Sequence, residues 1–156
     1  QRQMCIRDSI GTHGRSIYKI ELDLFYKYLE ASGNQNTISF LNFNEIKFSN
    51  SWGNKIMYSS ETYDVNFIID LFSSKNKNFE FEILNENNKT LNQGNFNTDY
   101  GFNKIKIPII IDKKLSGKYL KKIGFNAKIS DDGNRYLSKG EYILKVDNQE
   151  LKFSVK

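Results

Sequence analysis

The last stretch of the chain, 140–156, constrains its fold more than any other. Every second residue is apolar on both sides of a polar break at 147–149: Tyr142, Leu144 and Val146 before it, Leu151, Phe153 and Val155 after it. A period of two buries one face of a strand and leaves the other in water, so the pattern predicts a β-hairpin. Because a lone hairpin is marginal in water, this one must pack on further strands.

The chain from 61 onward supplies strands of the same period. Alternating apolar segments recur over 63–72, 79–83, 105–111 and 119–129, with polar turns between them. About six to eight short strands at this density predict an all-β domain, a two-sheet antiparallel β-sandwich. Proline cannot donate to a β-ladder, so the strand with Pro108 is expected at an edge or at a bulge. The Asn- and Gly-rich stretch 93–101 is expected to be irregular.

Composition narrows the functional classes. The 156 residues carry a net charge of +5, but the lysines are scattered and form no basic stripe with interleaved aromatic residues, which disfavours nucleic acid as a partner. The single cysteine, Cys5, excludes an internal disulfide framework and any multi-cysteine zinc site. No apolar run approaches the roughly 20 residues of a membrane-spanning helix. Phosphate-loop, HExxH and CxxC motifs are absent, so no cofactor is expected.

The N-terminal third differs from the rest of the chain. Residues 1–9 show neither alternation nor a helical stripe and resemble a translated sequencing-adapter remnant, so they are expected to be a non-native leader. Residues 17–22 alternate as a strand. Asp23 then suits the N-cap of a short helix with an apolar stripe, which Gly33 ends; the stripe consists of Leu24, Phe25, Tyr28 and Leu29.

One motif is more specific than these patterns. The sequence GTHGRSIY at 11–18 resembles the segment that closes the β-propeller of sortilin-like, BNR (Asp-box) repeat proteins of the type labelled glycosyl hydrolases. In that family the propeller is followed by a short helix, a linker with a Trp-Gly pair and an Ig/FnIII-like β-sandwich, and this chain has the same order. The resemblance implies that 10–22 is the last strand of a truncated propeller, 23–60 a helix and linker, and 61–156 the sandwich.

The resemblance also implies a function. The chain is expected to be a non-catalytic C-terminal accessory domain, structural or interacting, of a secreted, periplasmic or cell-surface bacterial protein. Its partners would be the missing N-terminal propeller and a glycan or a cell-surface protein. The alternatives are a carbohydrate-binding module, and part of an active glycoside hydrolase whose catalytic propeller is missing here.

A few side chains are candidates for these roles. His13 and Arg15 suit a structural role in the propeller motif, where an arginine fork ties backbone together, more than catalysis. Trp52, Tyr58 and Tyr63 could form a sugar-stacking platform, although Trp52 suits interior packing better. The carboxylate pairs Glu80 with Glu82 and Asp131 with Asp132 are typical of solvent-facing strand and turn positions rather than of the acid and base of a glycosidase. No catalytic or metal-binding residue is therefore assigned.

Overall fold

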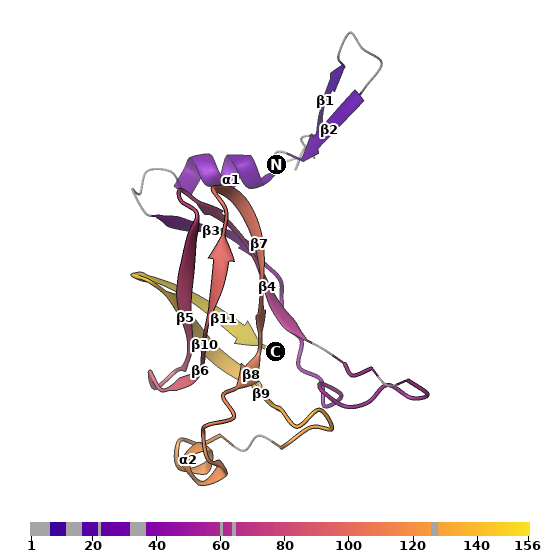
Figure 1. Cartoon of the computed structure of the whole chain (residues 1–156), viewed down its shortest axis with the longest axis vertical. Coiled ribbons are helices and arrows are strands. Elements are labelled where there is room, and N and C mark those ends of the chain that lie inside the picture. The colour runs from indigo at the N-terminus through magenta and orange to yellow at the C-terminus, as the bar shows by residue number, and fades with distance from the viewer. Residues whose placement is uncertain are drawn as a thin grey trace.

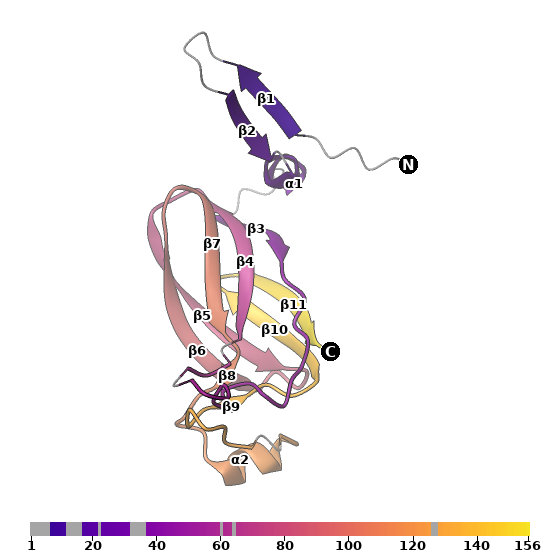
Figure 2. The ribbon, with the colours of Figure 1, turned by 90° about the vertical axis from the view of Figure 1, so that its right-hand side faces the viewer.

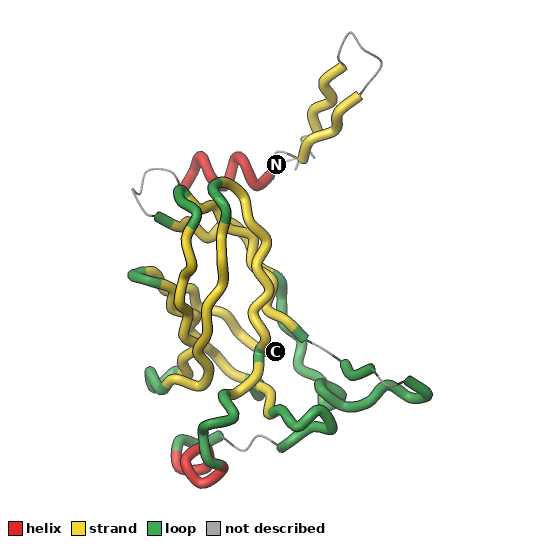
Figure 3. Tube along the Cα trace, in the orientation of Figure 1, coloured by secondary structure: helices red, strands yellow, loops and turns green. Residues whose placement is uncertain are grey.

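A computed structural model describes the chain over residues 7–11, 17–21, 23–31, 37–59, 61–63, 65–125 and 128–156. Most of these residues lie in antiparallel β-strands that form a sandwich of two sheets (Figure 1). The all-β sandwich predicted from the alternating pattern is thereby confirmed. A helix lies across one end of the sandwich, and loops gather at the other end (Figure 3).

The first sheet has three strands in the order β3-β4-β7, formed by β3 (Ile38–Phe43), β4 (Asn66–Ser73) and β7 (Gly101–Pro108). Alternate residues of β4 are buried, and these include Phe67 and Ile69. The edge position of β7 confirms the prediction for Pro108, which is its last residue. β3 lies upstream of the expected boundary at 61, so the sandwich takes up part of the predicted linker.

The second sheet has four strands in the order β11-β10-β5-β6, formed by β5 (Lys77–Asn85), β6 (Thr90–Thr98), β10 (Gly140–Val146) and β11 (Gln149–Val155). The predicted C-terminal hairpin is β10 and β11, and Val146 pairs with Gln149 at its tip. Asp147 in the turn adopts a left-handed φ of 49°, a conformation that aspartate and asparagine tolerate better than most residues.

The expectation of irregular structure at 93–101 is wrong for its first part, because 93–98 belong to β6. Gly94 pairs with Phe81 of β5, and a β-carbon at Gly94 would lie 2.8 Å from the Phe81 ring. The aromatic ring thus occupies the space that a side chain at 94 would need. A glycine inside a strand here marks a close approach, not a break in the strand.

The expected strand at 119–129 is also wrong, because α2 (Gly117–Lys122) takes up its first part. Ser116 caps this helix by accepting a hydrogen bond from the backbone N–H of Tyr119 at 3.2 Å. Gly124 follows with a φ of 83° and ends the helix. Two short strands, β8 (Ile110–Ile111) and β9 (Arg135–Tyr136), pair with each other on either side of this excursion.

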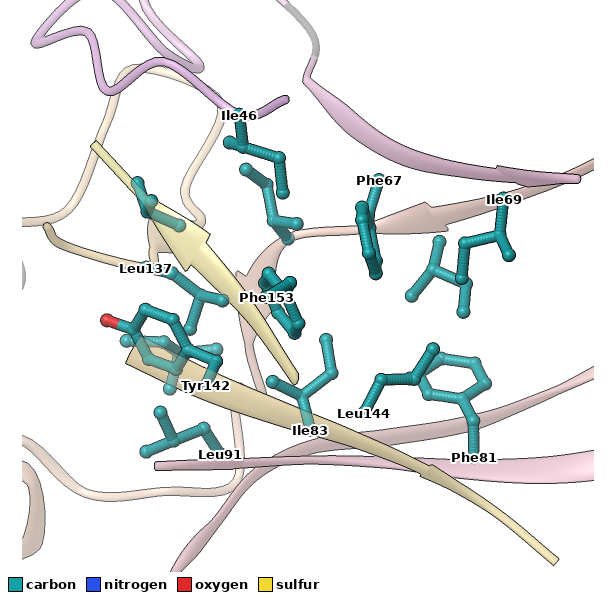
Figure 4. Packing of buried hydrophobic residues seen from close by; sticks show 14 of the residues in the cluster. Ile46, Phe67, Ile69, Phe81, Ile83, Leu91, Leu137, Tyr142, Leu144 and Phe153 are labelled. Atoms are coloured by element: carbon teal, nitrogen blue, oxygen red, sulfur yellow. The ribbon is translucent and has the colours of Figure 1, made fainter. Parts of the chain in front are cut away.

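Aromatic rings join the two sheets through the core (Figure 4). Phe67 of β4 stacks on Phe153 of β11 with ring centroids 4.4 Å apart, and Phe153 stacks on Tyr142 of β10 at 5.6 Å. Phe67 has no exposed surface. Stacked pairs of this kind add to the stabilisation from buried area, so this column is a main contact between the sheets.

Tyr142 also fixes the start of β10. Its hydroxyl donates a hydrogen bond of 2.8 Å to the carbonyl oxygen of Ser138, four residues upstream. This is the arrangement of the tyrosine corner of Ig-like sandwiches. Burial raises the pKa of Tyr142, so the hydroxyl stays a donor across the physiological range. The bond joins the 130–138 loop to the core.

The N-terminal elements stand apart from the sandwich (Figures 1 and 2). The strand expected at 17–22 is β2 (Ile17–Glu21), and it pairs with β1 (Arg7–Gly11) to form a hairpin. Part of the stretch 1–9 therefore has strand structure, which was not expected. The helix α1 (Asp23–Ala31) follows β2 closely and rests on the sandwich.

Candidate ligand-binding pocket

A pocket lies among the loops at the end of the sandwich opposite α1. The chain leaves β3 and runs alongside the end of β11, where the Phe48 N–H donates to the carbonyl of Lys156 at 2.7 Å. It then makes a tight turn through Trp52 and Gly53, in which the Asn54 N–H donates to the carbonyl of Ser51 at 3.0 Å. This anchored turn forms one wall of the pocket.

The opposite wall is the turn at 130–134, and hydrogen bonds tie the two turns together. The backbone N–H of Asp132 donates to the carbonyl of Gly53 at 3.0 Å. The backbone N–H of Lys55 donates to Oδ2 of Asp131 at 3.1 Å. Segments some 76 residues apart in the sequence are therefore joined into one hydrogen-bonded frame.

Asp132 organises this frame. Its Oδ2 accepts hydrogen bonds from the Tyr136 hydroxyl at 2.6 Å and from Nδ2 of Asn134 at 2.8 Å, and its Oδ1 accepts from the Asn134 N–H at 2.9 Å. Burial of Asp132 acts to raise its pKa, but the hydrogen bonds from Tyr136 and Asn134 outweigh burial and hold the pKa below its ordinary value of 3.8. The carboxylate is therefore charged at neutral pH.

This network makes part of the stability depend on pH. A carboxylate with a depressed pKa stabilises the fold above its unfolded pKa, and this contribution is lost as the pH falls through the folded-state pKa. We expect the difference in unfolding free energy between the wild type and Asp132→Asn to be constant at neutral pH and to shrink below pH 3.8. Urea unfolding at a series of pH values measures it. Tyr136→Phe removes one hydrogen-bond donor to Asp132 and should therefore reduce the pH-dependent part of the stability. If the free-energy difference between the wild type and Asp132→Asn stays unchanged down to pH 2, the pKa of Asp132 is not depressed in the folded protein.

Three aromatic residues line the pocket, and we call this group its aromatic floor: Phe48, Trp52 and Tyr136. The Phe48 and Trp52 rings meet edge to face at 5.3 Å between centroids, and the Trp52 and Tyr136 rings lie 6.0 Å apart. The pocket is also lined by residues with amide, hydroxyl and charged side chains, among them Asn50, Asn54, Lys128, Ser130, Asp131 and Ser138. The cavity has a volume of about 320 Å³.

The aromatic residues singled out in the sequence do not form one platform. Trp52 is only 7% exposed, which fits its packing role. Tyr58 is fully exposed in a turn, and Tyr63 is 47% exposed beside Trp52, with which it forms an isolated parallel bridge. Only Trp52 of the three lines the pocket. His13 and Arg15 lie outside the described residues.

The acidic residues considered in the sequence have separate environments. Glu80 and Glu82 lie on the outer face of β5, where they line a shallow hollow with Lys145 and Asp147. Asp131 accepts a hydrogen bond from the backbone N–H of Lys55 in the facing turn, and Asp132 accepts one from the Tyr136 hydroxyl. Among the described residues there is no group of three or more histidine, cysteine, aspartate and glutamate side chains that could hold a metal ion.

The sequence interpretation missed Tyr136 and the structural role of Asp132. The sequence did carry a signal at each wall of the pocket, namely the Trp52-Gly53 pair and the Asp-Gly turn at 132–133. Local patterns mark both as turns. They do not indicate that two turns so distant in sequence meet.

The chain matches no protein-family model, and it matches no curated protein. Within the described part of the chain, neither helix is long and apolar enough to cross a membrane.

Proposed function

We propose that the chain is the non-catalytic accessory end of a secreted bacterial BNR-repeat propeller protein, in which the sandwich is held to the propeller by the β1–β2 hairpin and α1. The observation that carries the proposal is the division of α1 into an anchored side and an exposed aromatic side. The GTHGRSIY resemblance at 11–18 supports the identity of the upstream partner.

One side of α1 is anchored to the sandwich. The ring of Tyr28 packs on Phe72 of β4 at 4.1 Å between centroids and meets Phe102 of β7 edge to face at 6.1 Å. Phe72 lies on the outer face of the first sheet, where it is half-buried. These contacts hold the helix at a defined place on the sandwich.

The other side of the same helix presents apolar surface. Phe25 is 44% exposed and Tyr26 is 43% exposed, and their rings meet edge to face with centroids 6.3 Å apart. The predicted apolar stripe is thus split, with Leu24 and Tyr28 partly buried and Phe25 and Leu29 largely exposed. Exposed aromatic side chains next to each other are typical of surfaces that pack on another domain.

The β1–β2 hairpin is a second observation that supports an upstream propeller as the partner. Within the described residues, β1 and β2 pair only with each other, and a two-stranded sheet alone is marginal in water. Further strands at its free edges would complete it, as in a four-stranded propeller blade. Since α1 begins two residues after β2 ends, a domain that pairs with the hairpin would lie beside Phe25 and Tyr26.

The source DNA tests the proposal directly. We expect the reading frame upstream of Ile10 to encode several Asp-box repeats. In place of residues 1–9 it should encode a propeller strand that pairs with β2 as β1 does here. In the extended protein, amide hydrogen exchange in 17–21 and 23–31 should be at least about tenfold slower than in the 156-residue chain, since docked segments open less often. A start codon close to Gln1 would overturn the proposal.

A pair of variants locates the contact. Phe25→Ala in the extended protein should speed exchange in 17–21, because it removes aromatic surface that packs on the propeller. Tyr119→Ala is the matched control, since Tyr119 is 38% exposed on α2 at the other end of the sandwich. Equal exchange rates in the two variants would place the contact elsewhere.

A further inference from the structure

We propose that the pocket at Trp52 binds a single neutral sugar residue, such as the terminal residue of a glycan. This inference goes beyond the proposed accessory role and does not depend on it, because the pocket lies at the end of the sandwich opposite α1. The evidence is the size of the pocket, its aromatic floor and the balance of its polar groups.

The size of the pocket suits a one-ring ligand. Its volume of about 320 Å³ lies at the lower end of the range of roughly 300–1,000 Å³ in which proteins hold small molecules. Its walls are fixed by the hydrogen bonds from Asp132 to Gly53 and from Lys55 to Asp131. A site that is already formed loses little free energy to ordering when a ligand binds.

The chemistry of the lining suits a sugar. A pyranose has apolar C–H faces and a rim of hydroxyl groups, so it needs apolar surface beneath it and polar groups around it. The apolar surface comes from the aromatic residues Phe48, Trp52 and Tyr136. The polar groups include the side-chain amides of Asn50 and Asn54. Amide side chains both donate and accept hydrogen bonds, as hydroxyl groups require.

The charge of the pocket favours a neutral ligand. Lys128 and Asp131 are its two ionisable rim residues and carry opposite charges. Oδ2 of Asp131 is already occupied by the Lys55 N–H. Asp131 would repel an anion and Lys128 would repel a cation, so neither kind of ligand has a net electrostatic advantage.

The test uses the intrinsic fluorescence of Trp52, which is the only tryptophan in the chain. The 156-residue protein is titrated with glucose, galactose, mannose and N-acetylglucosamine. Glycine, which is a zwitterion, and inorganic phosphate, which is an anion, serve as the probes that carry charged groups. We expect at least one sugar to give a saturable change in emission with a dissociation constant on the order of 1–10 mM, the strength within reach of a ligand of about twelve non-hydrogen atoms. Saturation-transfer NMR on the sugar protons provides a readout that does not depend on the indole.

Two rim variants and a control locate the site. Asn50→Ala and Lys128→Ala shorten exposed side chains of the pocket, and Asn50→Ala should weaken sugar binding about tenfold or more. Asn95→Ala removes an exposed asparagine from β6 and should leave binding within about twofold. The proposal is overturned by the absence of saturable sugar binding in both readouts, by tighter binding of glycine or phosphate, or by equal affinities in all three variants.

Discussion

Phe67→Ala is expected to lower the free energy of unfolding by about 3–5 kcal/mol. The side chain is completely buried, stacks on Phe153 across the sandwich and meets Phe43 edge to face at 5.6 Å. Alanine leaves a cavity between the two sheets. The hydrogen bonds within each sheet keep its strands in place, so the sheets cannot move together freely to fill the cavity. Since domains of this size are stable by about 5–15 kcal/mol, the loss would be a large share of the total.

Equilibrium unfolding in urea, followed by circular dichroism, measures the effect. Phe102→Ala is the matched control, because Phe102 lies on β7 of the same sheet but is 50% exposed. We expect the control to lose about 1 kcal/mol or less, as partly exposed side chains do. A loss of similar size in both variants would mean that Phe67 does not join the sheets as described.

The strands that the sequence predicted well are those whose pattern has one simple physical origin. In β4, β10 and β11 one face meets the core and alternate side chains are buried, so hydropathy repeats every second residue. The edge position of β7 could be predicted for a different reason, since Pro108 lacks the N–H that an inner strand needs.

The errors came from residues whose role depends on a distant neighbour or on capping. Gly94 suggested irregular structure because a glycine inside a strand pattern usually marks a break. The reason for the glycine is the ring of Phe81, which lies on another strand and cannot be predicted from the local sequence. At 119–129 the alternation of Ile123, Phe125 and Ile129 suggested a strand. The stronger signals were Ser116 before the segment and Gly124 within it, which cap and end a helix.

The pocket was less accessible to sequence interpretation than the fold. Trp52 could be identified as a packed aromatic residue, but its partner Tyr136 lies on β9, more than eighty positions downstream. No local pattern relates such distant positions. They meet because β8 pairs with β9 at the end of the sandwich where Ile46 and Phe48, just before the turn at 50–54, are hydrogen-bonded to Lys156 after β11.

The two proposed binding regions lie at opposite ends of the sandwich, since α1 lies at one end and the segments that line the pocket, 48–54 and 128–138, lie at the other (Figure 1). The exposed side of α1 and the hairpin stand at one end, and the pocket at Trp52 lies among the loops at the other. A domain held at the first end would leave the second open. The sandwich would thus present its pocket away from the proposed propeller, an arrangement that suits the proposed accessory role together with ligand binding.

Gly53→Ala is expected to lower the free energy of unfolding by about 2–4 kcal/mol, through two effects that add. Gly53 has a φ of 70°, which costs about 1–2 kcal/mol for a residue with a β-carbon. A β-carbon at this position would also overlap Cε2 of Tyr136 and lie 2.7 Å from Oδ1 of Asp132. The new methyl group therefore has to displace the buried ring of Tyr136, which is part of the pocket floor.

Gly133→Ala separates these two effects, because Gly133 has a similar φ of 76° and no atom within 4 Å of a β-carbon. We expect it to lose only the conformational part, about 1–2 kcal/mol. Gly53→Ala should also shift the fluorescence of Trp52 to longer wavelength, since displacement of Tyr136 admits water to the indole, whereas Gly133→Ala should leave the emission unchanged. Equal losses and equal spectra in the two variants would mean that the turn at 53 does not pack against Tyr136. The Trp-Gly pair would then be a flexible joint between domains, as in a linker, and the pocket would have no fixed wall.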